Sequence, residues 1–424
     1  MNILLIGSGG REHAIARKLS ESSSVDELYS YPGNPGIWQY APKADIKLEY
    51  PLVIDFCKSK KIDLVVVGPE QPLAEGITDI LNEAGIKVFG PSKKAASIES
   101  SKGFAKEFMF RHNIPTAKYK IFDNENIKDA EKYLNGCNYP VVIKADGLAA
   151  GKGVIIANEL HEAIDTLRSM FGGIFSDAGK KVVIEEFLKG EESSILAICD
   201  GKDFITLPSS QDHKRALDGD KGKNTGGMGA YSPAPIVNEN ILKKVEDKIL
   251  KPAIEGMQSE GFPFIGCLYA GLMIDNGEPS VVEFNARFGD PETQAVLSLF
   301  EGDLAKLLYS AAIGKIDKSA MKETSGKFAC CVILASEGYP DSYEKGYAIT
   351  GIDEAEKSGA IVYHSGTKTS TGKILSDGGR VLGVTGISNS LKGAIDNAYN
   401  AVGKINFANK FYRKDIGNKA LKIT

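Results

Sequence analysis

The segment that most constrains the fold of this chain is residues 281–287, Val-Val-Glu-Phe-Asn-Ala-Arg. Because successive residues of a β-strand face opposite sides, this run places Glu283, Asn285 and Arg287 on one face and apolar side chains on the other. Hard cations such as Mg²⁺ take oxygen ligands, and an arginine fork binds a carboxylate or a phosphate. The pattern predicts a strand with a metal and anion face, although a plain solvated strand face has the same alternation.

A turn signal, Asn276-Gly277, separates this strand from the apolar run before it. Asn-Gly between two apolar runs is the strongest short signal for a β-hairpin. A two-residue turn predicts a register with Ala270 opposite Glu283 and Leu268 opposite Asn285. These neighbours are small or apolar and leave the polar face poorly compensated, whereas a bound cation would compensate it.

Composition excludes several classes of protein. A length of 424 residues favours two to four domains, and a formal charge of −4 gives no general reason to bind nucleic acid or an anionic membrane. The six cysteines form no Cys-x-x-Cys pair, which indicates small reduced core residues. The start lacks a basic signal region, and the longest apolar run, 262–274, contains Pro and Gly. We expect a cytoplasmic protein without nucleic-acid or membrane partners, and a monomer with a dimer as the alternative.

Residues 1–101 alternate short apolar runs with helical stretches, which is typical of a parallel α/β sheet. Strands are predicted at 3–6, 28–31, 64–67 and 87–89. The first strand ends in a glycine turn, 7–13, that opens a helix and favours an anion. Glu12 replaces the third glycine of a dinucleotide fingerprint, and Asn34 rather than an acid follows the next strand. One phosphate of a smaller ligand is therefore expected at this turn.

The middle of the chain carries a helix at 102–112 and a strand that ends in Lys144. The glycine-rich stretch 145–153 follows, whose backbone can approach phosphates, although it is no Walker A loop and such a turn is often only a hinge. A further strand is predicted at 181–188. The polar stretch 209–235 is too long for an inert connector and predicts a functional loop.

The last hundred residues predict a small α+β domain. An apolar strand is expected at 328–335, and amphipathic spacing predicts a helix at 391–405. Nothing in this segment has a catalytic spacing, and His364 is interpreted as a packed core histidine.

Together these motifs resemble the ATP-grasp superfamily and, within it, the phosphoribosylamine–glycine ligase family. The resemblance covers the whole chain and rests on motifs at 7–13, 32–34, 67–70, 143–153, 210–215, 224–235 and 287–294. It implies a multidomain α/β and α+β protein. The implied parts are an N-terminal parallel α/β (pre-ATP-grasp) domain at 1–101, an ATP-grasp domain at 102–325 with a mobile lid at about 117–190, and a small C-terminal α+β domain at 326–424.

The resemblance also implies a role for each matched residue. ATP would be bound by Lys102, Lys144, Gly151, Lys152, Gly153, Glu185, Glu186, Leu188 and Glu191. Glycine and 5-phosphoribosylamine would be bound by Gly9, Gly10, Arg11, Asn34, Glu70, Asp212, Lys214, Thr225, Gly226 and Arg287, with the sugar phosphate at Gly9 to Arg11. Mg²⁺ or Mn²⁺ would be bound by Glu283 and Asn285, and the catalytic residues would be Arg287, Lys144 and Asp212.

By the same resemblance, the reaction joins glycine to 5-phosphoribosylamine in de novo purine biosynthesis, giving glycinamide ribonucleotide, ADP and phosphate through glycyl phosphate. Positioning and charge neutralisation suffice for it, so no protein nucleophile is needed. The chain departs from the pattern at Gly271, where many members of the superfamily carry another acidic ligand, which leaves the number of metal ions open. It departs again at Lys221 and Lys223, where relatives usually have a small polar residue and proline.

Three alternatives remain open from the sequence. The nearest is another ATP-grasp carboxylate–amine ligase or carboxylase, which would have no reason to carry the loop at 210–229. A dinucleotide-dependent oxidoreductase is disfavoured by Glu12 and Asn34. A nucleotide-binding regulatory protein is disfavoured by the intact set of charged residues but is not excluded by it.

Overall fold

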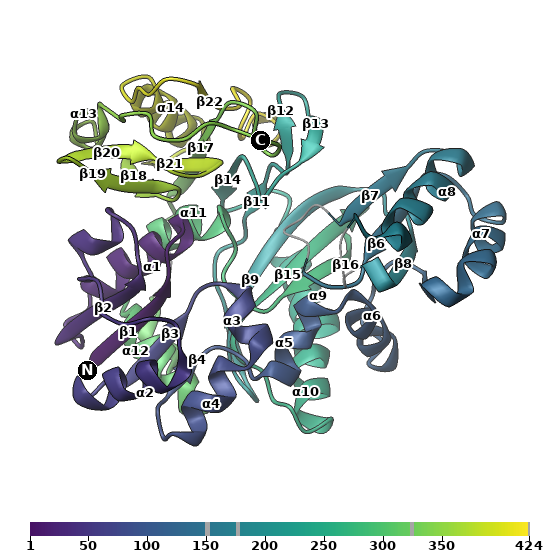
Figure 1. The fold of residues 1–424 in the computed structure, drawn as a ribbon, viewed down its shortest axis with the longest axis horizontal. Coiled ribbons are helices and arrows are strands. Elements are labelled where there is room, and N and C mark those ends of the chain that lie inside the picture. The colour runs from purple at the N-terminus through teal and green to yellow at the C-terminus, as the bar shows by residue number, and fades with distance from the viewer. Residues whose placement is uncertain (149–152, 175–178, 323–325, 423–424) are drawn as a thin grey trace.

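The computed structural model describes residues 1–148, 153–174, 179–322 and 326–422. It confirms the predicted fold class, because the chain forms a parallel N-terminal sheet, two four-stranded antiparallel sheets and an antiparallel C-terminal sheet, with helices packed on them (Figure 1). None of the described helices has the length and apolar character needed to cross a membrane. All six cysteines are free thiols.

The N-terminal sheet is parallel, as predicted, with strand order β2-β1-β3-β4. Its strands are β1 (Asn2–Gly7), β2 (Glu27–Pro32), β3 (Leu64–Val67) and β4 (Val88–Phe89). The helices between and after them are α1 (Gly10–Ser20), α2 (Tyr50–Ser59), α3 (Glu70–Glu75), α4 (Ile77–Glu83) and α5 (Lys93–Ser100). Strands β1 and β3 are buried on both faces because helices cover the sheet on both sides. The loops that follow β1 and β3 lead into α1 and α3, whose residues Arg11 and Glu70 line the central cavity described below.

A second sheet, of order β5-β8-β6-β7, forms a separate layer at one end of the molecule, far from β1 (Figure 1). Its strands are β5 (Tyr119–Asp123), β6 (Val141–Ala145), β7 (Val154–Ala157) and β8 (Lys181–Glu186). Helices α7 (Ile127–Asn135) and α8 (Leu160–Ser169) pack on it around a core of their own that includes Leu134, Ile143, Leu167 and Ile184. The opposite face of this sheet therefore remains available to line the site.

The central sheet has the order β10-β9-β15-β16, with β9 (Glu191–Asp200), β10 (Phe204–Thr206), β15 (Ile265–Asp275) and β16 (Glu278–Asn285). Alternate side chains of β9 enter two different cores. Ile195 and Ala197 pack with α9 (Glu239–Val245) and α10 (Lys251–Ser259), while Leu196 and Ile198 pack with α12 (Leu304–Ala312). Helix α6 (Lys102–Arg111) joins the first of these cores through Phe108.

The hairpin between β15 and β16 turns at Asn276 and Gly277, as predicted, with φ of 50° and 78° at these residues. The predicted register holds from Asp275 opposite Glu278 to Leu272 opposite Val281. A β-bulge then adds one residue to β16, so Glu283 lies opposite Gly271 and Asn285 opposite Tyr269.

The predicted pairs, Ala270 with Glu283 and Leu268 with Asn285, are therefore wrong. The carbonyl oxygen of Val282, at the bulge, accepts a hydrogen bond from Lys144 Nζ at 3.0 Å instead of serving the ladder. The strand also ends at Asn285, so Arg287 follows it in a bend rather than occupying a further strand position.

The C-terminal sheet has the order β11-β14-β17-β21-β18, with β22 (Lys410–Phe411) on the edge of β17. Strands β17 (Phe328–Ser336), β18 (Ile361–His364) and β21 (Arg380–Ser388) are covered by α14 (Leu391–Val402) and α13 (Ile352–Lys357). The other described pieces are the hairpin β19 (Thr367–Ser370) with β20 (Lys373–Ser376) and helix α11 (Glu292–Leu299). His364 is buried, as interpreted from the sequence.

The polar stretch 209–235 is not one loop but contains four short strands, β11 (Gln211–Asp212), β12 (Arg215–Leu217), β13 (Lys221–Asn224) and β14 (Gly229–Ser232). Strand β14 pairs with β17, so Gly229 lies opposite Val332 across a separation of about a hundred residues. A local sequence pattern cannot predict a pairing partner so far away in the chain. The pairing ties this stretch to the C-terminal sheet.

Candidate active site

A cavity of about 1040 Å³ lies where the four sheets meet. The predicted site residues that line it are Arg11, Glu70, Lys102, Lys144, Gly153, Glu185, Glu186, Leu188, Glu191, Asp212, Lys214, Thr225, Gly226, Glu283, Asn285 and Arg287. Gly9, Gly10 and Asn34 are not part of the lining. Gly151 and Lys152 lie outside the described residues.

The predicted metal face is formed by Glu283 and Asn285 at the end of β16. Burial alone would raise the pKa of Glu283, but the ammonium groups of Lys214, Lys144 and Lys102 outweigh it and lower the pKa. Glu283 is thus a carboxylate in a cationic setting. Among the described residues, no cluster of three or more His, Cys, Asp or Glu side chains is arranged to hold a metal. Two oxygen ligands suit an ion that takes its remaining ligands from substrate phosphates and water.

A buried triad of charges lies beside this face. The Glu185 carboxylate forms ion pairs with Lys106 Nζ and Lys144 Nζ, each at 2.9 Å, and all three side chains are almost fully buried. Burial lowers the pKa of Lys106 to about 8. Lys106 was not predicted, because a lone lysine on α6 belongs to no motif. The triad holds Lys144 beside Glu283, where a phosphate and its cation would meet.

The other end of the lining carries groups suited to a nucleoside. Glu186 is exposed, and its carboxylate accepts the Lys118 N–H at 2.9 Å. Oxygen Oε2 of Glu191 is buried and has no hydrogen-bond partner among the described residues. An acceptor left without a partner inside a cavity fits a ligand hydroxyl, because a buried unsatisfied acceptor is costly.

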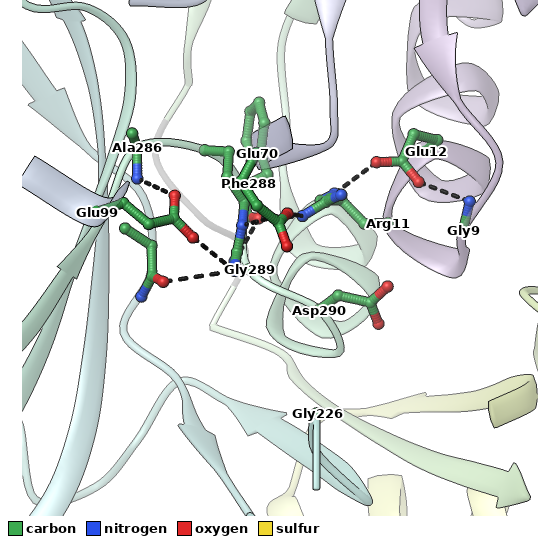
Figure 2. Close-up of polar contacts among 12 residues, drawn as sticks. Gly9, Arg11, Glu12, Glu70, Glu99, Gly226, Ala286, Phe288, Gly289 and Asp290 are labelled. Atoms are coloured by element: carbon green, nitrogen blue, oxygen red, sulfur yellow. Dashed lines mark hydrogen bonds and ion pairs between the residues drawn. The ribbon is translucent and has the colours of Figure 1, made fainter. Parts of the chain in front are cut away.

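Arg287 lies between two carboxylates. Its Nε donates to Glu70 at 3.2 Å, and its Nη2 is 2.9 Å from Glu99, whose other oxygen accepts the Ala286 N–H (Figure 2). Burial raises the pKa of Glu99. Burial would also raise the pKa of Glu70, but the neighbouring guanidinium groups of Arg287 and Arg11 outweigh it and lower that pKa. Glu99 was missed by sequence reasoning, since it ends a helix with no recognisable motif. The guanidinium group of Arg287 is therefore already held in one orientation before a substrate binds.

Strand β11 and the residues after it supply the groups opposite the metal face. Lys214 Nζ is 3.1 Å from Glu192 and 3.9 Å from Glu283. Burial, assisted by carboxylates that include Glu292, raises the pKa of Asp212 even though Lys214 opposes the change. Asp212 can therefore hold a proton closer to neutral pH than an ordinary aspartate, which is fully ionised there.

The N-terminal glycine turn is closed by the protein's own groups. The Gly9 N–H donates to Glu12 at 2.6 Å, and a Cβ on Gly10 would lie 2.5 Å from Ser365 Oγ. The Asn34 amide donates to the carbonyls of Ser8 and His364 and accepts the N–H groups of residues 36 and 37. Arg11 alone reaches the cavity from this turn.

Glu12 fills the space that a dinucleotide would need. A Cβ on Gly7 would lie 2.3 Å from the Glu12 side chain, and one on Gly68 would lie 2.1 Å from it. The Glu12 carboxylate also accepts Arg11 Nε at 2.5 Å. The two glycines therefore make room for Glu12 rather than for a pyrophosphate.

The C-terminal sheet adds residues to the lining that no pattern predicted. Tyr339 Oη accepts the Gly226 N–H at 3.0 Å, and Arg380 Nη1 donates to the Gly226 carbonyl oxygen. Behind the site, Gly417 N–H approaches His213 Nε2 at 3.4 Å, and burial lowers the pKa of His213 to about 4. The C-terminal segment therefore forms one wall of the cavity.

Three family models match the chain in order along its length. The model described as Phosphoribosylglycinamide synthetase, N domain, matches residues 1–99; the ATP-grasp (A) domain matches 100–293; and the C domain matches 329–419. The phosphoribosylamine–glycine ligase of Neisseria meningitidis serogroup A is 47% identical over 426 residues, covering 99% of this chain and 100% of that protein. The same ligase of Leptospira interrogans serovar Lai is 48% identical over 426 residues, covering 99% of each.

Solved structures agree with these relatives. The crystal structure of phosphoribosylamine–glycine ligase from Thermotoga maritima has a TM-score of 0.86 and 33% identity, covering 98% of this chain and 100% of that one. A biotin carboxylase from Campylobacter jejuni has a TM-score of 0.72 at 15% identity, covering 97% and 93%. The second likeness shows a shared fold alone.

Proposed function

We propose, because the chain belongs to the phosphoribosylamine–glycine ligase family, that its central cavity holds all three substrates together. Membership of this family makes the chain an ATP-dependent ligase that forms a C–N bond in purine biosynthesis. The strongest support is that predicted site residues far apart in the sequence, with Arg11 the first and Arg287 the last, line one cavity. Within the ATP-grasp superfamily, the loop that carries Asp212 and Lys214 argues against a ligase or carboxylase that uses another acid and acceptor.

ATP occupies the part of the cavity between the β5–β8 sheet and β16. Lys102 and Lys144 neutralise its phosphates, and both already lie beside Glu283. The adenine lies along residues 186–188, and the ribose hydroxyls satisfy the unpartnered oxygen of Glu191. A cation such as Mg²⁺, held by Glu283 and Asn285, supplies charge neutralisation at the transferred phosphate.

Glycine and 5-phosphoribosylamine occupy the side of Arg287 and Lys214. The glycine carboxylate attacks the γ-phosphorus, which releases ADP and forms glycyl phosphate. The amine of 5-phosphoribosylamine then attacks the glycyl carbon, the amide C–N bond forms, and inorganic phosphate leaves. Arg287 neutralises the carboxylate and the leaving phosphate, and Asp212 is placed to take the proton that the amine loses.

Release of ADP tests the assignment directly. ADP should form when glycine and 5-phosphoribosylamine are present together and should be nearly absent with either alone. Steady ADP release without the amine would indicate a different acceptor, and no release under any condition would indicate a nucleotide-binding regulatory protein.

A further inference from the structure

Arg380, the first residue of β21, lines the cavity with half of its guanidinium already occupied. Its Nη1 donates to the Gly226 carbonyl and, at 2.8 Å, to the Asp290 carbonyl, and it lies 3.4 Å from the Asp290 carboxylate. Among the described residues, neither Nε nor Nη2 of Arg380 has a hydrogen-bond partner. The two donors of the Nε–Nη2 edge are parallel and match two oxygens of a phosphate or a carboxylate.

The guanidinium is held rigidly, which makes this edge preorganised. A Cβ on Gly226 would lie 3.1 Å from Arg380 Cζ, so the planar group packs closely against the turn and a larger residue there would push on it. The N–H of the same glycine donates to Tyr339 Oη. The side chain of Arg380 is 21% exposed, so its remaining donors are not deeply buried without a ligand.

The arginines nearer to the metal face lack such a free edge. Arg11 Nε is paired with Glu12, and Arg287 Nε and Nη2 are paired with Glu70 and Glu99. The end of α1 is likewise occupied by carboxylates, because a Cβ on Gly9 would lie 2.8 Å from Glu12 Oε2 and 3.4 Å from Asp290 Oδ2. Of these three arginines, Arg380 therefore offers an additional anion a free edge with two donors.

Apart from the ATP phosphates, the substrates bring two anionic groups, and the position of Arg380 selects between them. The glycine carboxylate must meet the γ-phosphate beside Glu283, where Lys214 and Arg287 lie. Gly226, against which Arg380 packs, lies well away from Glu99 and Ala286, with Asp290 nearer the centre (Figure 2). An anion bound at Arg380 would therefore lie away from the reacting glycine carboxylate. It matches the phosphate of the amine substrate, which is at the opposite end from the amine.

We propose, on the basis of the function proposed above, that Arg380 binds the 5-phosphate of phosphoribosylamine through its Nε–Nη2 edge. The substrate then spans the cavity with its amine towards Arg287 and its phosphate towards the C-terminal sheet. Arg11 orients Glu70 and the bend at Phe288 instead of contacting the phosphate.

The test compares two amines that differ only in the phosphate: phosphoribosylamine, formed from ribose 5-phosphate and ammonia, and ribosylamine, formed from ribose and ammonia. Arg380→Gln should lower kcat/KM for phosphoribosylamine at least about tenfold more than it lowers that for ribosylamine, because both amines lose the support of Gly226 and Asp290 but a charged hydrogen bond to the phosphate is lost only with the first. Calorimetric binding of ribose 5-phosphate should weaken by a similar factor. The KM for ATP and for glycine should stay within about twofold.

Two control variants separate the phosphate contact from its alternatives. Tyr339→Phe removes the hydroxyl that holds Gly226 but keeps the charge of Arg380, so any loss should be equal for both amines. A phosphate-selective loss in Arg11→Gln, with none in Arg380→Gln, would overturn the proposal in favour of the N-terminal turn. Equal losses for both amines in Arg380→Gln, or a rise confined to the KM for glycine, would also overturn it. A wild-type chain inactive with phosphoribosylamine would instead refute the proposed function.

Discussion

At the scale of single residues, the site is built from charges whose partners are already in place. Glu283 is kept ionised by three lysines, and Arg287 is oriented by Glu70 and Glu99 before any substrate binds. Such preorganisation spares the enzyme the free energy of reorienting dipoles and charges during the reaction. Because the charge of Glu283 is surrounded by these lysines, removing that charge is the most direct test of the arrangement.

Glu283→Gln keeps the shape of the side chain and removes its negative charge. We expect turnover to fall at least about a hundredfold at ordinary Mg²⁺ concentrations, since both the metal ligand and the counter-charge of Lys214 are lost. The thermal unfolding midpoint should change little. Glu278→Gln is a matched control, because Glu278 lies on the same strand but is exposed and pairs with Lys244. Near-normal turnover of Glu283→Gln would remove Glu283 from the metal site.

At the scale of elements, the C-terminal tail fastens the β12–β13 hairpin that follows Lys214. Arg413 is fully buried and is 2.9 Å from Asp220 and 2.7 Å from Asp415, and it donates to the Arg215 carbonyl. Asp415 in turn accepts the Gly219 N–H at 2.8 Å. Other ion pairs of the hairpin, Lys223 with Asp341 and Lys419 with Asp220, involve exposed lysines, so the Arg413 cluster is its buried anchor.

Arg413→Met should destabilise the chain by about 3 kcal/mol, because two carboxylates lose the charge that pairs them. Amide hydrogen exchange across residues 213–224 should become faster, and turnover should fall because Lys214 is no longer held. Lys414→Met is the control, since the Lys414 side chain is exposed and its backbone N–H still donates to Asp218. Unchanged exchange in Arg413→Met would show that the hairpin is held by other contacts.

Local patterns predicted those elements whose causes are local. The N-terminal strands follow from apolar runs, the β15–β16 turn follows from Asn276-Gly277, and Glu283 and Asn285 follow from alternation in one strand. The bulge in β16 was missed because the Val282 carbonyl bonds to Lys144, which is far away in the sequence. Strand β14, Glu99 and Arg380 were missed for the same reason, since each acquires its role from a partner that only the folded chain brings near.

At the scale of the whole molecule, two buried histidines join helix α1 to strand β18 of the C-terminal sheet. The His364 N–H donates to His13 Nδ1 at 2.7 Å, so that nitrogen must stay unprotonated. Burial lowers the pKa of His364 to about 4, and burial and His364 lower that of His13. Between about pH 4 and 6.5 the unfolded chain therefore binds more protons than the folded chain, and stability falls as the pH falls through this range.

We expect the fold to lose about 2 kcal/mol per histidine between pH 7 and pH 5, which should appear as a lower urea midpoint. His13→Gln keeps an acceptor for the His364 N–H but cannot titrate, so its midpoint should depend less on pH. His161→Gln is the matched control, since the His161 side chain is 84% exposed. An equal pH dependence in wild type and His13→Gln would show that this contact does not govern acid stability.

The order of chemical events also belongs to the whole molecule, since in the proposed arrangement the β5–β8 sheet, β16 and the C-terminal sheet would each hold one participant. A carboxylate is a poor electrophile until ATP activates it, either by phosphorylation or by adenylation. Lys102 and Lys144 interact electrostatically with Glu283, and converging charges of this kind would favour attack on the γ-phosphorus of an ATP bound there. Glycine labelled with heavy oxygen in its carboxylate should therefore pass one labelled atom into inorganic phosphate, with ADP as the other product. Label in AMP, with pyrophosphate released, would show an adenylating ligase. Unlabelled phosphate with steady ADP formation would show uncoupled hydrolysis and would leave Arg287 without a carboxylate to neutralise.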